Sequence, residues 1–240
     1  ELSAMTYEST NLGMRVSRLY LNPISGRIIK NGLEKAMEVL IGDDKYHQIS
    51  PFGILHLTAS TPDFLPLWPK NSDYEIIQAS LHSHSREILT ENSNLEEEKM
   101  KGALVLESWI NELKFEDMEN KWGVQPGDLR SRTELAEWIL YAIRRILDED
   151  EDLKNLNKDA HRLLLESINE IHMRVRYGCK SDLLGLVSLR GVGRIRAREL
   201  NNTLGVVNVK DLTMLTENDK YKLSDLRGWS EKLVENIIIS

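Results

Sequence analysis

The stretch LRGVGRIRARELNNTLGV, residues 189–206, combines a glycine-rich turn with three arginines at alternate positions. Gly191 and Gly193 have no side chains, so a backbone turn built on them can approach an anion closely and direct N–H groups at it. Arginine side chains can in turn form bidentate hydrogen bonds with phosphate oxygens. The stretch is therefore suited to binding a phosphate backbone. The net charge of −7 gives no hint of this, because local clustering of cations matters more than the total.

The spacing of this stretch is that of two helices joined by a hairpin. On a helical wheel, Ala197 and Leu200 fall on one apolar stripe, and Arg194 and Arg198 share a polar side. We therefore expect Arg194 and Arg198 to contact phosphates. Arg196 falls at the far edge of the stripe and is expected either to join them or to reach back and fix the position of this domain. The alternative is a tight turn between helices with a solvated basic face.

A weaker copy of the pattern follows in DLRGWSEKLVENII, residues 225–238. Gly228, Trp229 and Ser230 stand where Gly-Val-Gly stands in the first copy. Val234 and Ile237 take the positions of Ala197 and Leu200. No arginine follows this turn, so we expect the second hairpin to be structural.

The second candidate for chemistry is Trp138, in the helical pattern GDLRSRTELAEWILYAIRRIL. Counting about 100° per residue from the first aspartate, the apolar residues cluster near about 50°, whereas Trp138 falls near about 280°. Ser131 and Arg145 share its face, and Tyr141 is close by. A tryptophan outside the apolar stripe is suited to stacking on a nucleic-acid base. The alternative is that it packs against another helix or domain.

The elements that must position these residues are predicted to be helices. The periodic segments are residues 24–41, 73–89, 95–113, 128–147 and 159–177. Asn22 before Pro23 is a typical helix start, and Asp73, Asp128 and Asp159 stand where capping aspartates are expected. No convincing strand pair follows residue 22, so the fold class is all-α: a helical bundle and then a small helix-hairpin-helix domain. The acidic run 148–152 is expected to be a solvated loop.

Several chemistries are disfavoured by the composition. The single cysteine, Cys179, allows no disulfide framework and no cysteine-based zinc site. His82 and His84 would point to different faces of a helix, so no metal site is expected. No phosphate-binding loop of the G-x-x-x-x-G-K-[ST] type occurs, so no cofactor and no catalytic residue are expected in this chain. No run is long and apolar enough to predict a membrane helix.

Three separated blocks resemble one family of helicases. RVSRLYLNPISGRIIKNGL, PGDLRSRTELAEWILYAIRRI and RVRYGCKSDLLGLVSLRGVGRIRAREL occur in the order found in archaeal Hjm-type DNA helicases. These are superkiller-like members of helicase superfamily II and relatives of animal HELQ. The resemblance covers essentially the whole chain. It implies that residues 1–22 are the end of a winged helix, 23–178 a ratchet bundle and 179–240 the terminal helix-hairpin-helix domain, with two ATP- and Mg-binding motor domains outside this chain.

The resemblance also implies roles for both candidate sites. Trp138 matches a tryptophan that stacks on bases of the strand leaving the motors. The family's partner arginine would stand at Ser131, between Arg130 and Arg132, so which arginine replaces it is open. Arg196 and Arg198 match a strand-binding motif in the terminal domain, which is thought to act as a brake.

The expected function is therefore that of a single-stranded-DNA-binding accessory region of an ATP-dependent 3′-to-5′ DNA helicase. Such an enzyme would act in repair at stalled forks. The expected partners are single-stranded or forked DNA and the protein's own motor domains, in a cytoplasmic monomer that is inactive without the motors. The alternatives are the ratchet region of a related RNA helicase and a helical scaffold for protein interactions. A strand affinity that falls steeply with salt would distinguish the nucleic-acid-binding functions from the scaffold. Comparing the affinities for DNA and RNA of one sequence, which differ in the 2′-OH, would distinguish the DNA helicase from the RNA helicase.

Overall fold

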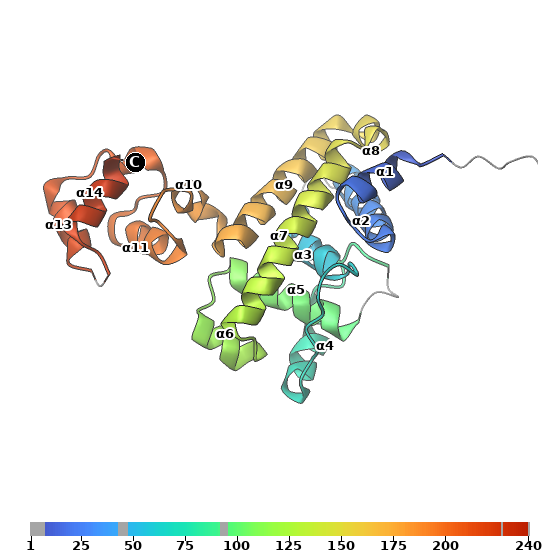
Figure 1. Ribbon diagram of the computed structural model, residues 1–240, viewed down its shortest axis with the longest axis horizontal. Coiled ribbons are helices and arrows are strands. Elements are labelled where there is room, and N and C mark those ends of the chain that lie inside the picture. The colour runs from blue at the N-terminus through green and yellow to red at the C-terminus, as the bar shows by residue number, and fades with distance from the viewer. Residues whose placement is uncertain (1–7, 43–47, 92–95, 227, 240) are drawn as a thin grey trace, which may run out of the picture. The chain divides into compact units, whose positions relative to one another are not determined.

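The computed structural model describes residues 8–42, 48–91, 96–226 and 228–239 (Figure 1). Within these ranges the regular structure is helical and no strand occurs, which confirms the all-α fold class. Contacts divide the chain into two compact units. The first comprises residues 1–107 and 115–172, and the second comprises residues 108–114 and 173–240.

The first unit is built from nine labelled α-helices and one short 3-10 helix, as far as the described residues go; α5 and α9 end in residues of the second unit. They are α1 (Asn11–Arg18), α2 (Pro23–Ile41), α3 (Pro51–Ala59), η1 (Asn71–Asp73), α4 (Tyr74–Ser83), α5 (Glu97–Ile110), α6 (Phe115–Trp122), α7 (Pro126–Asp148), α8 (Glu151–Leu156) and α9 (Lys158–Tyr177).

Helix α7 forms the centre of the first unit. It contacts α2, α3 and α8 (Figure 1). One side of it is buried along almost its whole length, because its apolar residues recur with the helical period. The buried residues are Leu129, Ala136, Ile139, Leu140, Ala142, Ile143, Ile146 and Leu147. This agrees with the stripe expected from the sequence, although Leu135 is only half-buried.

Two helix starts show how local sequence fixes the elements around α7. The side chain of Asn22 accepts a hydrogen bond from Ile24 N at 2.9 Å, and Pro23 occupies the first turn, as predicted. Ser50 repeats the arrangement before Pro51 at the start of α3. The cap satisfies one N–H group that has no partner inside the helix, and proline loses no bond there.

None of the three predicted aspartates caps its α-helix with its side chain, and Asp128 and Asp159 do not stand at the N-cap position. Helix α7 begins at Pro126, two residues before Asp128, because proline is favoured in the first turn. At α9, Asn157 accepts hydrogen bonds from the backbone N–H groups of Asp159 and Ala160, at 3.1 and 3.0 Å. For α7 and α9 the prediction placed the helix start too late in the sequence.

The predicted helix 73–89 begins where expected but ends earlier, because Asp73 stands at the N-cap of α4 and the helix stops at Ser83. Asp73 ends η1, and its carboxylate pairs with Lys101 instead of capping α4. Helix α4 ends at Ser83 because His84 stacks on Phe52 of α3, with ring centroids 3.9 Å apart. This tertiary contact redirects the chain before residue 89.

Helix α3 was missed by the sequence prediction. Every residue from Phe52 to Ala59 is buried, so the segment has no polar side and no amphipathic period. It packs closely on α2, where a Cβ at Gly32 would lie only 2.6 Å from Leu57 Cδ1.

The acidic run 148–152 is not the solvated loop that was predicted. It contains the end of α7, a short turn and the start of α8. Asp150 is buried in that turn, where it binds Lys30 Nζ at 2.6 Å and accepts a hydrogen bond from Leu153 N at 3.0 Å. Burial alone would raise the pKa of Asp150, but the hydrogen bond from Lys30 lowers it overall.

The second unit has its own hydrophobic core. Its elements are η3 (Ser181–Leu183), α10 (Leu184–Val187), α11 (Arg194–Leu204), α12 (Val209–Leu212), α13 (Glu217–Ser224) and α14 (Glu231–Ile239). Ala197 and Leu200 lie in this core, as the helical wheel predicted. Trp229, Val234 and Ile237 of the second glycine turn also lie in it, which supports the structural role expected there.

The assignment of residues 1–22 to a winged helix stays a prediction; in the described part of this segment, α1 packs on α2. Among the described residues, no helix is both long enough and apolar enough to cross a bilayer.

We predict that the buried His56 makes the fold sensitive to acid. Burial, assisted by Lys99, lowers the pKa of His56 from 6.5 to about 4, and Nε2 has no hydrogen-bond partner among the described residues. The unfolded chain therefore binds a proton at higher pH than the folded chain does. The free energy of unfolding should fall by about 3 kcal/mol between pH 6.5 and pH 4 on this account alone.

Urea denaturation across this range, with His56→Gln as the reference, measures the contribution. The variant should lose less stability on acidification than the wild type. Parallel losses in the two proteins would show that His56 titrates normally.

Candidate nucleic-acid interface

Trp138 lies on α7 beside the buried stripe. Its neighbours Ile139 and Leu140 are completely buried, whereas Trp138 is half-buried. Tyr141, less than one turn further on, is 43% exposed. The predicted partial exposure of Trp138 thus agrees with the structure.

Ser131 and Arg145 lie about 10 Å before and after Trp138 along the helix, at 1.5 Å per residue. Ser131 is half-buried. Arg145 pairs with Glu149, and the same carboxylate lies 3.2 Å from Nε of Arg15. Because the guanidinium of Arg145 already binds the carboxylate of Glu149, Arg145 is less suited to binding a phosphate than its position on the helical wheel suggests.

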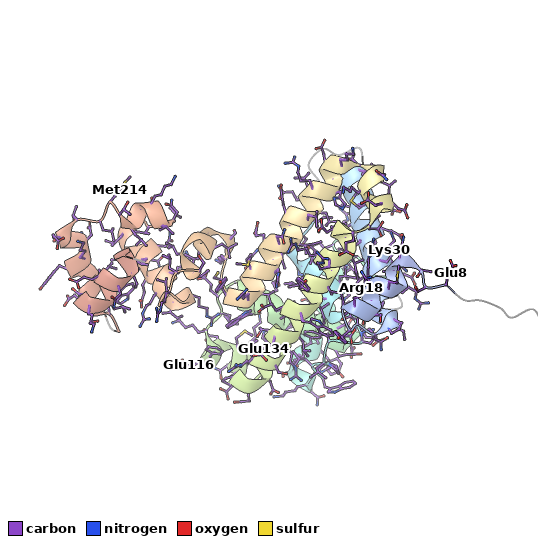
Figure 2. The ribbon with its side chains drawn as sticks, turned by 45° about the horizontal axis from the view of Figure 1, so that its top comes forward. Glu8, Arg18, Lys30, Glu116, Glu134 and Met214 are labelled. Atoms are coloured by element: carbon purple, nitrogen blue, oxygen red, sulfur yellow. The ribbon has the colours of Figure 1, made fainter. Side chains whose placement is uncertain are left out.

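The structure separates the two arginines that flank Ser131. Arg130 is 81% exposed and forms only a surface ion pair at 2.8 Å with Glu134, which Figure 2 labels on α7. Arg132 is mostly buried, and it binds Asp128 at 3.3 Å and the carbonyl oxygen of Pro66 at 3.4 Å. Arg130 is therefore the one that can reach a ligand in solvent.

The Gly-Val-Gly turn is in the second unit and leads into α11. Gly191 has φ +84°, a conformation that other residues rarely adopt, and Val192 is buried beneath the turn. Gly193 is the N-cap of α11 and provides no side-chain acceptor for the first N–H groups of the helix. A Cβ at Gly193 would have no neighbour within 4 Å, so the backbone is open to an anion here.

Arg194 does not extend into solvent as a phosphate contact would. Its Nη1 donates to the carbonyl of Gly178 and its Nη2 to that of Leu113, both at 3.2 Å. The guanidinium also lies 4.1 Å from the ring centre of Trp109. The side chain holds α11 against residues 108–114 of the same unit, and the phosphate contact expected of Arg194 stays a prediction.

Arg198 likewise contacts acids of its own unit. It pairs with both oxygens of Glu112, at 2.7 and 2.8 Å, and with both oxygens of Asp182, at 2.8 and 2.9 Å. Burial alone would raise the pKa of Glu112, but the hydrogen bonds from Arg198 and from Lys180 N lower it. The hydrogen bond from Arg198 is the main cause of the lowered pKa of Asp182. Arg198 is thus the centre of an ion-pair network, and its expected contact with phosphate stays a prediction.

Arg196 joins the two glycine turns. Its Nη1 donates to the carbonyl of Gly191 at 2.8 Å and its Nη2 to that of Gly228 at 3.3 Å. The guanidinium lies 6.0 Å from the ring centre of Trp229. Arg196 thus fixes the first turn within its own unit.

Arg190 is a cation that the sequence reasoning missed. It directly precedes Gly191 and is exposed, and no ion pair is found for it among the described residues. The helical wheel could not identify it because it lies before the helix. The one feature of the sequence that could have identified Arg190 is its position immediately before Gly191.

The remaining candidates do not form a site. Burial raises the pKa of the Cys179 thiol to about 11, so it is a poor nucleophile. His84 is stacked on Phe52 and lies 3.0 Å from Glu87. Within the described part of the chain, no group of three or more metal-binding side chains comes together.

Comparison with known proteins identifies the family. Residues 52–178, which are more than half of the chain and include all of α7, match the family model described as archaeal helicase, domain 4. The chain belongs to this family. The resemblance to archaeal helicases drawn from the three sequence blocks is thereby confirmed.

The similar curated proteins carry the name ATP-dependent DNA helicase Hel308. That of Pyrococcus horikoshii is 30% identical over 95% of this chain, and that of Methanocella arvoryzae is 33% identical over 80%. That of Methanococcus vannielii is 30% identical over 88%. The chain spans only 25–29% of the length of these relatives.

We predict that the Arg198 network stabilises the second unit. Arg198→Ala leaves the carboxylates of Glu112 and Asp182 without their cation. It should lower the free energy of unfolding by about 1–2 kcal/mol, allowing for partial exposure. Arg190→Ala is the matched control and should change stability by less than about 0.5 kcal/mol.

Chemical denaturation at several pH values measures both variants. Because the folded pKa values of both acids are lowered, the contribution of Arg198 is present above the unfolded pKa, near about 4, and is lost as pH falls below it. Equal stability of the two variants at pH 7 would contradict this role of Arg198.

Proposed function

We propose that this chain is the single-stranded-DNA-binding region of an ATP-dependent 3′-to-5′ DNA helicase that acts in repair at stalled forks. One observation carries the proposal: Trp138 lies half-exposed on the central helix of the segment that matches the archaeal helicase family. A tryptophan next to a buried stripe is held firmly, yet it keeps a face for a base. Its stacking on bases does not depend on sequence, which suits an enzyme that moves along any strand.

On α7 the strand would follow the side that carries Trp138. The indole stacks on a base, and Arg130 takes the place of the family's arginine as a phosphate contact. Ser131 lies on the same side with a hydroxyl that can donate to the strand. Arg145 would contact a phosphate only by exchanging its bond with Glu149.

In the second unit the strand phosphates would meet the Gly-Val-Gly turn of a helix-hairpin-helix domain. The open N-terminus of α11 and the glycine backbone attract an anion, and Arg190 supplies an exposed cation. Arg194, Arg196 and Arg198 act as positioning residues that hold the turn in shape. This assignment revises the direct contacts that the sequence suggested for them.

The rest of the enzyme would supply the chemistry. In this proposal ATP and Mg bind motor domains outside this chain, and residues 1–22 belong to a winged helix beside them. The chain alone would hydrolyse no ATP. The intact protein would act as a cytoplasmic monomer on forked DNA.

We predict that the isolated chain binds single-stranded DNA and that Trp138→Ala weakens binding by about 1–3 kcal/mol, the usual contribution of one stacked base. Fluorescence anisotropy with a labelled oligodeoxythymidine measures the dissociation constant. Leu156→Ala, at an exposed apolar side chain on α8 away from the Trp138 face, is the control for general disturbance of the first unit. An RNA strand of the same length tests the RNA-helicase alternative, through its 2′-OH groups.

Two results would contradict the proposal. Absence of salt-dependent binding to any strand would favour the protein-interaction scaffold. A large loss of melting temperature in Trp138→Ala, with DNA affinity unchanged in the folded fraction, would make Trp138 a core residue.

We predict that Arg190, and not Arg198, makes the ionic contact at the turn. The slope of log K against log[salt] should shrink by about 0.7 in Arg190→Ala, the value for one phosphate contact on a single strand. It should stay unchanged in Arg198→Lys, which keeps the charge and alters only the internal network. A reduced slope in Arg198→Lys with an unchanged slope in Arg190→Ala would reverse the assignment.

A further inference from the structure

The loop that follows α3 presents two large apolar side chains to solvent. Residues 64–70 read FLPLWPK. Phe64 and Leu67 are buried, whereas Leu65 is 50% exposed and Trp68 is 71% exposed. Packing within the unit explains the buried Phe64 and Leu67 but does not explain the exposed Trp68.

The backbone of this loop is stiff. Leu65 and Trp68 each stand directly before a proline, Pro66 or Pro69. A residue before proline is restricted to extended conformations, and proline fixes its own φ. The two exposed side chains are therefore the two whose backbone is most constrained, and little conformational entropy is lost when a ligand binds them.

A buried ion pair anchors the loop from the side of α5. The Nζ of Lys101 donates to the carbonyl oxygen of Trp68 at 3.1 Å and to Asp73 Oδ2 at 2.6 Å. Both charged side chains are almost completely buried. Burying an ion pair in this way has a large desolvation cost, so it is weak evidence for stability alone. Here it fixes the main chain of Trp68 while the indole stays in solvent.

Helix α7 anchors the same loop from the other side. Arg132 Nη2 donates to the carbonyl of Pro66 at 3.4 Å, and its buried Nε has no hydrogen-bond partner among the described residues. Arg132 directly follows Ser131, which shares the face of Trp138. The loop therefore contacts the N-terminal half of α7, close in sequence to Ser131 on the face of Trp138.

The charge of the loop favours a polyanion. Lys70 is the only charged residue of 64–70 and is exposed next to the Trp68–Pro69 pair. The flanking carboxylates of Asp63 and Asp73 already accept hydrogen bonds, from Asn22 N and Lys101. A tryptophan followed closely by a lysine offers a flat surface for a base and a cation for its phosphate. A basic protein segment would gain nothing from this charge.

We propose that Trp68 is a second stacking site for an unpaired base, on a loop that Arg132 of α7 and Lys101 of α5 hold in place. The inference rests on the proposed function, because it extends the strand path along α7. Two stacking sites on separate elements would hold successive parts of the strand, and the rigid loop keeps the second one in a fixed position.

The test compares normal and abasic strands on the full 240-residue chain. Trp68→Ala should bind oligodeoxythymidine roughly tenfold or more weakly, as expected for one lost stack. It should bind an abasic strand of the same length as tightly as the wild type does. Trp68→Phe should recover most of the affinity, whereas Trp68→Leu, which keeps an apolar side chain without a ring of π electrons, should not. Leu156→Ala, at a 65% exposed position on α8, is the matched control and should change neither affinity.

Three other outcomes would distinguish an error in the second stacking site from an error in the proposed function. If Trp138→Ala weakens binding and Trp68→Ala does not, the second site is wrong and the proposed function stands. If Trp68→Ala weakens binding to both strands equally, the loop does not act by stacking and the inference is overturned. If the wild-type chain binds neither strand, the proposed function fails and the second site fails with it.

Discussion

The burial of one side of α7 is the constraint on which the first unit depends. Ile139, Leu140 and Ile143 are completely buried, and they fix the rotation of the helix about its own axis. Because successive residues are about 100° apart, this rotation also fixes where every other side chain points. Trp138 cannot enter the core without removing these residues from it. The half-buried position of Trp138 is therefore a consequence of how the core residues of α7 pack.

Cations in the second unit show a different division of roles. Arg194 and Arg198 have fixed partners at hydrogen-bond distance, whereas Arg190 reaches solvent. An arginine that already binds two carboxylates must lose those bonds to bind phosphate, and that loss offsets the gain. A cation without such partners has no comparable cost. The internal network and the exposed cation are thus complementary, because one shapes the turn and the other can meet the strand.

Local patterns predicted the features that depend on a few neighbouring residues. The cap at Asn22, the buried stripe of α7 and the packing of Ala197 and Leu200 all arise within one or two helical turns. Periodicity also placed Trp138 outside the stripe. These features required no knowledge of the distant chain.

Features that depend on distant partners could not be predicted in this way. Arg198 meets Glu112, which lies 86 residues earlier, and Asp150 meets Lys30, which lies 120 residues earlier. Neither pairing has a local signal, so the sequence could show neither the acids that hold Arg198 nor the burial of Asp150. Helix α3 was missed for the opposite reason, since complete burial removes the amphipathic period.

The central claim is that the exposed side of α7 binds unpaired bases, and the five tryptophans of the chain offer a direct measurement. Their indole N–H signals can be followed by NMR while oligodeoxythymidine is added to the chain. Trp122 is buried, and the indole N–H groups of Trp109 and Trp229 are bonded to Val175 O and Glu199. We predict that the Trp138 signal shifts with the strand concentration while these three remain in place. A saturating titration in which Trp138 does not move would contradict the account.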